Sequence, residues 1–455
     1  MIKFLPLGGA QDIGANCYYL NLNDTGIILD CGMHPQKTGL ESLPDFDLLN
    51  NLPLDYVFIS HAHQDHLSSL PFLIKRFPYL KIITTPQTRA LAELTLHNSV
   101  SILRNQIADE KFDIFSHDEV DLLIKMIDYK SYNEKFEIKG YRNHEETEVE
   151  FFDAGHILGS AGILIQHRGS KKNIFYSGDI NLTNQPIIKG AVLPNNKIDF
   201  LILETTYGAT DSSYISGWNV QAERLASSIN NIFNDGGSVL IPVFSLGKTQ
   251  EILKTLWDLI QKGKLANTDI YTGGLGTKIN RVYDYNRYVV NMNDPEFELS
   301  SIPQRNLYEI EDPNDFFKSP CIVLASSGMM IEGTASYNLA KRWIKQKKSA
   351  IFTVGYMEKS TPGYKFANTT KGEKIKLSES EQEEEIKCTI KKFRFTAHSK
   401  REDLLEIVNR LKPANVILIH GDDVAIDWIG SSILNQFNGI KVYRAEVGKE
   451  ILLST

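Results

Sequence analysis

Features typical of secreted and membrane proteins are scarce in this sequence of 455 residues. It contains only four cysteines and no CxxC pair, so neither a disulfide framework nor a thiolate zinc site is expected. No apolar run approaches the roughly 18 residues of a membrane span. The first nine residues are too broken by Pro6, Gly8 and Gly9 for a secretory signal. We therefore expect a cytoplasmic protein with no membrane partner.

An excess of positive charge is also missing. Lys and Arg total 49 against 56 Asp and Glu, which gives a formal net charge of −7. The composition therefore does not indicate a domain that binds nucleic acid through bulk charge. A chain of this length is too long for one small core, and it predicts two domains or one domain with a large insertion.

Short apolar runs that end at a polar residue recur in the first ~205 residues and return near residue 415. Runs of four to six Val, Ile, Leu and Phe are typical of buried strands. A single polar residue after such a run is an ordinary cap. Six of them predict a site, because sites in α/β sheets form beyond the carboxyl ends of strands. These six residues are Asp30, His61, His156, Asp179, Glu204 and His420.

Between and after these strands the periodicity is helical. The predicted helices cover residues 66–77, 88–102, 118–127, 220–233 and 249–260. The acidic run 379–385 is expected to be a solvated loop. Strand character then returns at 391–395 and 415–419. This order predicts three segments: a first domain over 1–205, an inserted domain over 206–395, and a return to the first domain over 396–455.

The sequence His61-Ala62-His63-Gln64-Asp65-His66 is the most specific motif in the chain. Its four donor side chains cannot share one face of a regular helix. They can converge on a cation if a strand ends at His61 and a helix begins near His66. Imidazole and carboxylate donors suit Zn2+ without any thiolate. Because Asp65 and His66 point differently from His61 and His63, the loop favours two metals over one.

A second metal needs donors from elsewhere in the chain. His156 and His420 offer imidazoles at other strand ends, and Asp179 offers a carboxylate that could bridge two metals. Taken alone, His156 could equally be an ordinary turn histidine, but beside the HxHxDH motif a ligand is favoured. Asp30 is interpreted as a residue that fixes the ring of a ligating histidine, with an ordinary turn aspartate as the alternative.

With these donors in place, the chain resembles the metallo-β-lactamase fold, and nearly its whole length resembles the β-CASP nucleases. That branch includes the endonuclease subunit of the pre-mRNA cleavage-and-polyadenylation complex and bacterial and archaeal ribonucleases. The motifs that carry the resemblance are the HxHxDH loop and residues 8–14, 204–208, 395–399 and 419–422. The fold implied is α/β: a metallo-β-lactamase αβ/βα sandwich with an inserted α/β β-CASP domain.

The resemblance also implies a site. One Zn2+ would be held by His61, His63, His156 and Asp179, and a second by Asp65, His66, Asp179 and His420. Asp65 would thus be both a ligand and part of the catalytic group. His398 would act as general acid, oriented by Glu204.

A histidine at position 420 goes with RNA substrates in this family. The resemblance therefore implies a ribonuclease that cleaves single-stranded RNA, internally or from the 5′ end, by a two-metal hydroxide mechanism. It leaves a homodimer open. A small-molecule hydrolase of the same fold is the main alternative, and a catalytically silent scaffold is another.

Outside the metal motifs, two loops have the composition of phosphate sites. Residues 237–251 read as strand, turn and helix, in which Ser245 and Lys248 could hold a phosphate at the helix start. A plain strand-to-helix turn is the alternative. A second loop, Ser326-Ser327-Gly328, resembles the family's RNA-contacting glycine loop. The remaining histidines are interpreted as surface or structural residues; they are His34, His97, His117, His144 and His167.

Overall fold

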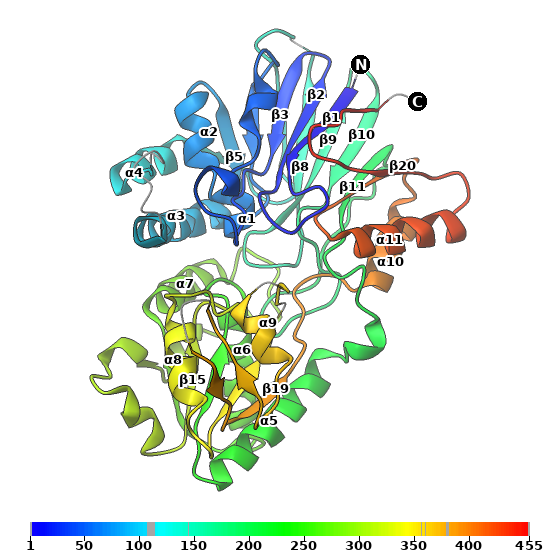
Figure 1. Ribbon diagram of the computed structural model, residues 1–455. Helices are drawn as coiled ribbons and strands as arrows, with labels where there is room; N and C mark the ends of the chain where they lie inside the picture. The colour runs from blue at the N-terminus through cyan, green and yellow to red at the C-terminus, as the bar shows by residue number, and fades with distance from the viewer. Residues whose placement is uncertain are drawn as a thin grey trace. The chain divides into compact units, whose positions relative to one another are not determined.

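The structure, a computed structural model, describes residues 2–106, 114–143, 145–355, 357–359, 361–378 and 382–453 (Figure 1). The chain divides into two compact units. The first comprises residues 1–184, 188–212 and 398–455, and the second comprises 185–187 and 213–397. The first unit is therefore left and re-entered along the chain.

Two seven-stranded mixed sheets form the first unit. The first sheet has the order β22 (Ile451–Leu452), β1 (Ile2–Gly8), β2 (Cys17–Leu22), β3 (Thr25–Leu29), β4 (Tyr56–Phe58), β5 (Lys81–Thr84), β6 (Ile127–Tyr129). The second has the order β21 (Lys441–Arg444), β20 (Asn415–Ile419), β11 (Phe200–Glu204), β10 (Lys172–Tyr176), β9 (Ala161–His167), β8 (Thr147–Asp153), β7 (Lys135–Ile138). From β3 to β6, and from β10 through β11 and β20 to β21, neighbouring strands are parallel.

Alternation along β11 explains how this unit is layered. Phe200 and Ile202 belong to a core cluster that also contains Phe4 and Phe58 of the other sheet, so the two sheets pack face to face. Leu201 and Leu203 point the other way, into a cluster with α10 (Arg401–Leu411) and α11 (Asp423–Gln436). Helices α1 (Gln64–Leu67), α2 (Leu70–Arg76), α3 (Pro86–Gln106) and α4 (His117–Met126) lie beside β5 (Figure 1). The predicted αβ/βα sandwich is confirmed.

The second unit is a parallel sheet with helices. Its strands follow the order β14 (Arg305–Asn306), β13 (Asp269–Thr272), β15 (Cys321–Ala325), β12 (Val239–Pro242), β16 (Ala350–Thr353), β19 (Thr389–Lys392). Its longer helices are α5 (Trp218–Asn234), α6 (Lys248–Gln261), α7 (Gly274–Asn286), α8 (Ala335–Trp343) and α9 (Pro362–Ala367). Trp343 is fully buried in a cluster with Phe316, Val323 and Leu240, which ties α8 to the sheet.

The six predicted strands with polar ends are all present, but two other predictions were wrong. The helix expected over 66–77 is two helices, because Ser69 N–H donates to the carbonyl of Cys31 at 3.0 Å and Pro71 has no N–H to continue the ladder. Within the acidic run, Glu384–Glu385 form β18, which pairs with β17 (Lys374–Ile375) instead of a loop. Residues 379–381 and His144 lie outside the described residues.

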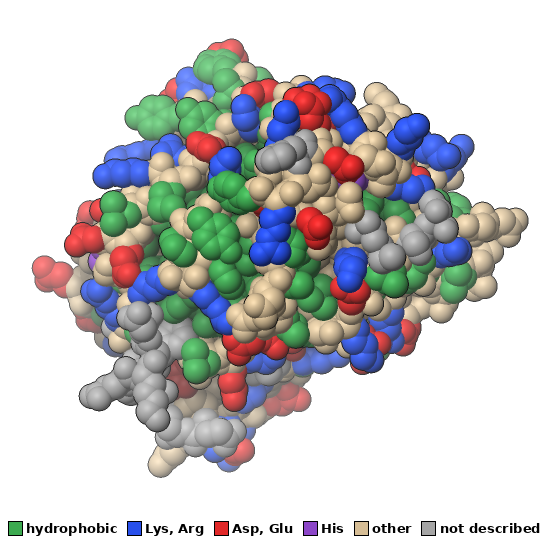
Figure 2. Space-filling view, turned by 90° about the horizontal axis from the view of Figure 1, so that it is seen from above, with side chains coloured by type: hydrophobic (Ala, Val, Ile, Leu, Met, Phe, Trp, Pro, Cys, Tyr) green, Lys and Arg blue, Asp and Glu red, His purple; other side chains and the backbone are tan. Residues whose placement is uncertain are grey.

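Charge is mixed on the face drawn in Figure 2, where Lys and Arg side chains lie among Asp and Glu. This distribution agrees with the small negative net charge of −7. Among the helices of the described ranges, none combines the length and apolar character required to cross a bilayer.

Candidate metal centre

The candidate site belongs wholly to the first unit and follows the carboxyl ends of strands in both sheets. Along β10, β11 and β20 the parallel register pairs Tyr176 with Ile202 and Glu204 with Ile419. The residues that follow these strands therefore lie together at the carboxyl end of the sheet. Parallel β3 and β4 deliver the segments after Leu29 and Phe58 in the same way.

The HxHxDH loop is held by backbone hydrogen bonds to a neighbouring segment. Carbonyls of Asp65 and His66 accept N–H groups of Asn16 and Cys31 at 2.9 and 2.8 Å. The loop and the segment around Gly32 approach so closely that a Cβ on Gly32 would lie 1.6 Å from the Asp65 carbonyl oxygen. Only glycine fits at position 32. The backbone of this neighbouring segment therefore holds the loop in place and leaves its four donor side chains free to face the site.

Four donor residues form what we call the first ligand set: His61, His63, His156 and Asp179. The Nδ1 atom of His63 lies 3.1 Å from the Nε2 atoms of both His61 and His156. Oδ2 of Asp179 lies 3.5 Å from His61 Nε2 and 3.6 Å from His156 Nε2. The donor atoms of the set all lie within 4.8 Å of one another, so they surround a single point.

The second ligand set comprises Asp65, His66 and His420, and it adjoins the other oxygen of Asp179. Oδ1 of Asp179 lies 3.3 Å from His66 Nε2 and 3.0 Å from His420 Nδ1. Oδ2 of Asp65 lies 3.4 Å from His420 Nε2. Asp179 therefore presents one oxygen to each set, which is the geometry of a bridging carboxylate.

The hydrogen bonding of these groups fits a cation better than it fits direct pairing. Oδ1 of Asp179 and Nε2 of His420 are buried and find no hydrogen-bond partner among the described residues, although charged groups lie nearby. Buried polar atoms are normally satisfied. Lone pairs of carboxylates and imidazoles that converge on a shared point can be satisfied together by a metal ion. Imidazole and carboxylate donors suit divalent zinc.

Electrostatics point the same way. Burial alone would raise the pKa of Asp179, but the histidines around it, His66 and His420 first, hold that pKa well below its usual range. Burial alone would lower the pKa of His420, but Asp179 and Asp65 raise it to about 10. Without a cation the buried carboxylates thus draw protons onto the imidazoles. Metal ions would replace those protons.

Asp30 lies behind the second ligand set. Its Oδ2 lies 2.8 Å from His66 Nδ1 and accepts the hydroxyls of Ser60 and Tyr176 at 2.7 and 2.5 Å. Because a carboxylate only accepts, Nδ1 of His66 carries the hydrogen and Nε2 is left with a lone pair. Such a contact would fix the ring of His66, and the role of Asp30 as an orienting residue stays a prediction.

Supporting residues around the ligands were missed by sequence reasoning. Asn16 Nδ2 lies 3.0 Å from His66 Nε2, Ser60 Oγ lies 3.0 Å from His61 Nδ1, and Thr206 Oγ1 lies 3.2 Å from His420 Nδ1. Ser60 directly precedes the HxHxDH motif and Thr206 lies within the motif at 204–208, and that placement was the available signal. Asn16 gave none, since it is 50 positions from its partner.

The pair His398 and Glu204 adjoins the shared Asp179. His398 Nδ1 lies 3.0 Å from Glu204 Oε1, and its Nε2 lies 3.9 Å from Asp179 Oδ2. Glu204 is 1% exposed and also accepts the N–H groups of Ile180 and Thr206. Burial by itself would lower the pKa of His398, but Glu204 and then Asp179 raise it above the ordinary value. A histidine in this position can give a proton near neutral pH.

Family comparisons cover most of the chain. The model of the metallo-beta-lactamase superfamily matches residues 11–189, that of the Beta-Casp domain matches 249–366, and that of the Zn-dependent metallo-hydrolase RNA specificity domain matches 383–445. The chain belongs to the β-CASP branch of the metallo-β-lactamase superfamily. The metallo-β-lactamase fold implies that a divalent metal is bound, and the two ligand sets are clusters that could hold one.

Several curated β-CASP relatives are similar along nearly the whole chain. Cleavage and polyadenylation specificity factor subunit 3 of Dictyostelium discoideum is 29% identical over 97% of this chain and 56% of its own length. Integrator complex subunit 11 of Danio rerio is 27% identical over 96% and 72%, and Endoribonuclease YSH1 of Kluyveromyces lactis is 27% identical over 98% and 59%. The chain thus spans little more than half the length of the first of these relatives.

One solved structure, a protein of unknown function from Enterococcus faecalis V583, aligns over 99% of both chains with a TM-score of 0.56. At a sequence identity of 15%, this similarity is one of fold alone.

The phosphate-binding residues predicted in the β-CASP unit follow two neighbouring parallel strands. Ser245 comes after β12, and Ser326, Ser327 and Gly328 come after β15. The loops touch, since a Cβ on Gly328 would lie 3.0 Å from the backbone nitrogen of Phe244. The structure therefore brings these residues together at the carboxyl ends of two inner strands, where the serines are half-buried.

Lys248 is placed differently from the loop serines. Its side chain is buried, its Nζ donates to the carbonyl of Phe395 at 2.7 Å, and it lies 5.1 Å from the centroid of the Trp218 ring. Burial lowers the pKa of Lys248 to about 8, while Glu251 opposes that shift. The ammonium of Lys248 is thus hydrogen-bonded to the backbone just before His398, and its contact with phosphate stays a prediction.

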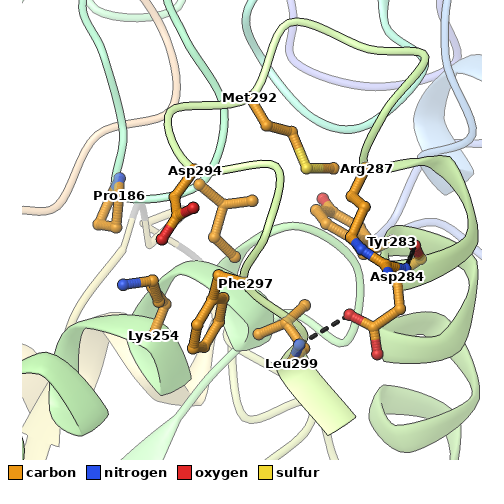
Figure 3. Close-up of a pocket in the computed structure, with 10 residues that line it drawn as sticks. Pro186, Lys254, Tyr283, Asp284, Arg287, Met292, Asp294, Phe297 and Leu299 are labelled. Carbon is orange, nitrogen blue, oxygen red and sulfur yellow. Dashed lines mark hydrogen bonds between the residues drawn. The ribbon is translucent and has the colours of Figure 1, made fainter. Parts of the chain in front are cut away.

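In a hollow of the β-CASP unit, most of the charged side chains that line it are paired with neighbours (Figure 3). Asp284 accepts the N–H groups of Leu299 and Ser300 at 2.7 and 3.0 Å. Arg287 pairs with Glu298 at 2.6 Å, and Lys254 lies over the ring of Phe297. Because most of its charges are already paired, this hollow does not call for a ligand.

The histidines interpreted as structural have local partners. His34 pairs with Asp12 at 2.9 Å and His167 with Glu145 at 3.1 Å. His97 Nδ1 lies 2.8 Å from His117 Nδ1 on the neighbouring helix.

Proposed function

We propose that this chain is a ribonuclease that uses two Zn2+ ions to hydrolyse phosphodiester bonds in single-stranded RNA. The observation that carries the proposal is the convergence of two adjoining ligand sets on the shared carboxylate of Asp179, with the His398–Glu204 pair beside it. The first set offers four donors. The second offers three, and Asp179 adds a fourth, which supports a count of two metals per chain.

Different residues of the chain would position the metal ions and donate the proton. When bound, the two cations supply a water whose pKa is near neutral and offset the negative charge that builds on the phosphate. Asp179 adjoins both sets, one oxygen toward each, and so holds them at a fixed spacing, while Asp65 contacts His66 and His420 within the second set. Glu204 accepts the Nδ1 hydrogen of His398 and raises the pKa of the ring, so that the imidazolium form carries a second proton on Nε2, which can pass to the leaving 3′ oxygen of the RNA. The products would be a 5′-phosphate and a 3′-hydroxyl.

RNA is favoured as substrate over a small molecule. The region 383–445 matches the RNA specificity domain, and the named relatives include an endoribonuclease and a polyadenylation factor. A small-molecule hydrolase of the same fold would need neither the His398–Glu204 pair nor the β-CASP unit. The four cysteines are free and buried, which supports the predicted reducing cytoplasm. The homodimer stays a prediction that a mass measurement in solution would test.

The proposal is tested by digesting one RNA labelled separately at its two ends, with 5′-phosphate and 5′-triphosphate forms compared. Wild-type protein loaded with zinc should cleave it, while His398→Ala should retain its metal and lose turnover. Internal fragments from both labels indicate endonuclease action, and mononucleotides from the 5′ label indicate exonuclease action. Hydrolysis of a chromogenic ester or lactam with the RNA left intact would refute the proposal.

A further inference from the structure

A group of basic side chains and one exposed aromatic ring lies at the edge of the sheet in the β-CASP unit. Strand β19 is one of the two edge strands of this sheet, and α5 lies beside it (Figure 1), with a hydrogen bond of 3.1 Å from Lys391 Nζ to Ser228 Oγ. We call this group the α5–β19 strip. Its members are Tyr214, Arg224, Lys391, Lys392 and Arg394.

The cations of the α5–β19 strip are not neutralised within the chain as described. None of its four basic side chains lies within 4.0 Å of a carboxylate there, whereas Lys264 nearby is paired with Glu223 of α5. Their partners are neutral: Arg224 reaches the amide of Gln221. The Nη1 atom of Arg394 is buried and finds no hydrogen-bond acceptor among the described residues.

Like charges are also crowded in the strip. Burial, and then the guanidinium of Arg394, lower the pKa of Lys392. Such crowding costs free energy in the free protein, and a polyanion that binds there relieves it. Lysines on an edge strand also block unwanted pairing with another sheet, which would account for Lys391 and Lys392. That explanation does not cover Arg224, Arg394 or the exposed ring.

Tyr214 gives the strip a stacking surface. Its side chain is 68% exposed, and the Cζ atom of Arg394 lies 5.5 Å from its ring centroid. An exposed aromatic ring beside cations is how proteins hold single-stranded nucleic acid, in which bases are free to stack and phosphates are evenly spaced. A negatively charged protein segment would use the cations but would have less use for the ring.

The strip is also close to the proposed general acid along the chain. Arg394 precedes His398 by four residues. Resting on the proposed function, we infer that the α5–β19 strip binds the single-stranded RNA substrate. Phosphates contact Arg224, Lys391, Lys392 and Arg394, and a base stacks on Tyr214.

The test measures binding of a fluorescent 20-nucleotide single-stranded RNA to the full-length, zinc-loaded His398→Ala protein between 50 and 300 mM KCl. In that background, the double variant Arg224→Gln/Arg394→Gln should weaken binding about tenfold and reduce the salt slope by about 1.4, the value for two phosphate contacts on a single strand. Tyr214→Ala should weaken binding at least fivefold with the slope unchanged. The control Lys262→Gln, an exposed cation of the same unit, should change neither.

The outcomes separate the strip from the proposed function. Unchanged affinity and slope in the double variant, with RNA cleavage by wild type, would overturn the strip alone. Weaker binding at an unchanged slope would also overturn it, because the loss would not come from phosphate contacts. A slope that falls as predicted, with no cleavage by wild type, would support the strip and refute the ribonuclease. Displacement of RNA by polyglutamate as readily as by unlabelled RNA would overturn the strip in favour of an acidic protein partner.

Discussion

Replacing Glu204 by glutamine removes one charge while nearly preserving shape. In the protein, Oε1 of Glu204 lies 3.0 Å from His398 Nδ1 and accepts the Ile180 N–H at 3.0 Å, and Oε2 accepts the Thr206 N–H at 3.1 Å. A glutamine can keep its oxygen toward His398. Its amide nitrogen then faces the Thr206 N–H, and one donor is left unsatisfied.

Two effects of different size follow from this geometry. A hydrogen bond to a charged group contributes about 1.5–3 kcal/mol and one to a neutral group about 0.5–1.5 kcal/mol, so the exchange should lower the pKa of His398. At a pH above the pKa of His398, the protonated fraction, and with it kcat, should fall about tenfold. Complete removal of the acid in His398→Ala should cost more, about 10²- to 10⁴-fold. The unsatisfied N–H should cost about 1–3 kcal/mol of unfolding free energy.

The assay is kcat on a fixed RNA as a function of pH, with metal content measured in parallel. The alkaline limb of the profile should move to lower pH in Glu204→Gln, because the raised pKa of His398 depends on that carboxylate. The matched control is Asp55→Asn, a buried carboxylate of the same unit that accepts the Gly26 and Tyr141 N–H groups. It should lose similar stability with an unchanged profile. A Glu204→Gln profile that matches wild type, or loss of metal from that variant, would refute the reasoning.

Three further predictions concern other parts of the structure. Asp30→Asn should weaken metal affinity 10- to 100-fold in chelator competition, because His66 loses the acceptor that sets its tautomer. Burial raises the pKa of Asp153 to about 7, so the folded state holds that proton more tightly than the unfolded one, and stability falls as pH rises toward 7. Between pH 5 and 8 the wild type should lose about 2–3 kcal/mol of unfolding free energy that Asp153→Asn retains, as measured by urea titration of both. Trp343→Ala should cost about 3–5 kcal/mol in the β-CASP unit and leave metal content unchanged.

The strand ends that carry the site could be predicted because two signals coincide locally. A buried strand needs a continuous apolar run, and a ligand at its end needs one donor directly after it, as at Ile419 and His420. Both signals lie within a few residues of each other. The strand β11 could likewise be predicted from its apolar run, in which alternate residues such as Ile202 and Leu203 face opposite layers.

The contacts that orient the ligands could not be predicted, because they join distant segments. Tyr176 reaches Asp30 across 146 positions, and no periodicity links the two. The same holds for Lys248, whose motif suggests a phosphate but whose amine is taken by the carbonyl of Phe395, 147 positions away. The break between α1 and α2 also depends on a distant partner, the carbonyl of Cys31. The predicted domain boundaries at residues 205 and 395 remain a prediction.

The central claim is that Asp179 joins two metal positions built by the HxHxDH loop, His156 and His420. The most direct measurement is the number of zinc ions per chain in metal-replete, full-length protein, determined by native mass spectrometry with elemental analysis. The account predicts two zinc ions per chain. One zinc ion would contradict the shared role of Asp179, and none would contradict the metal site itself.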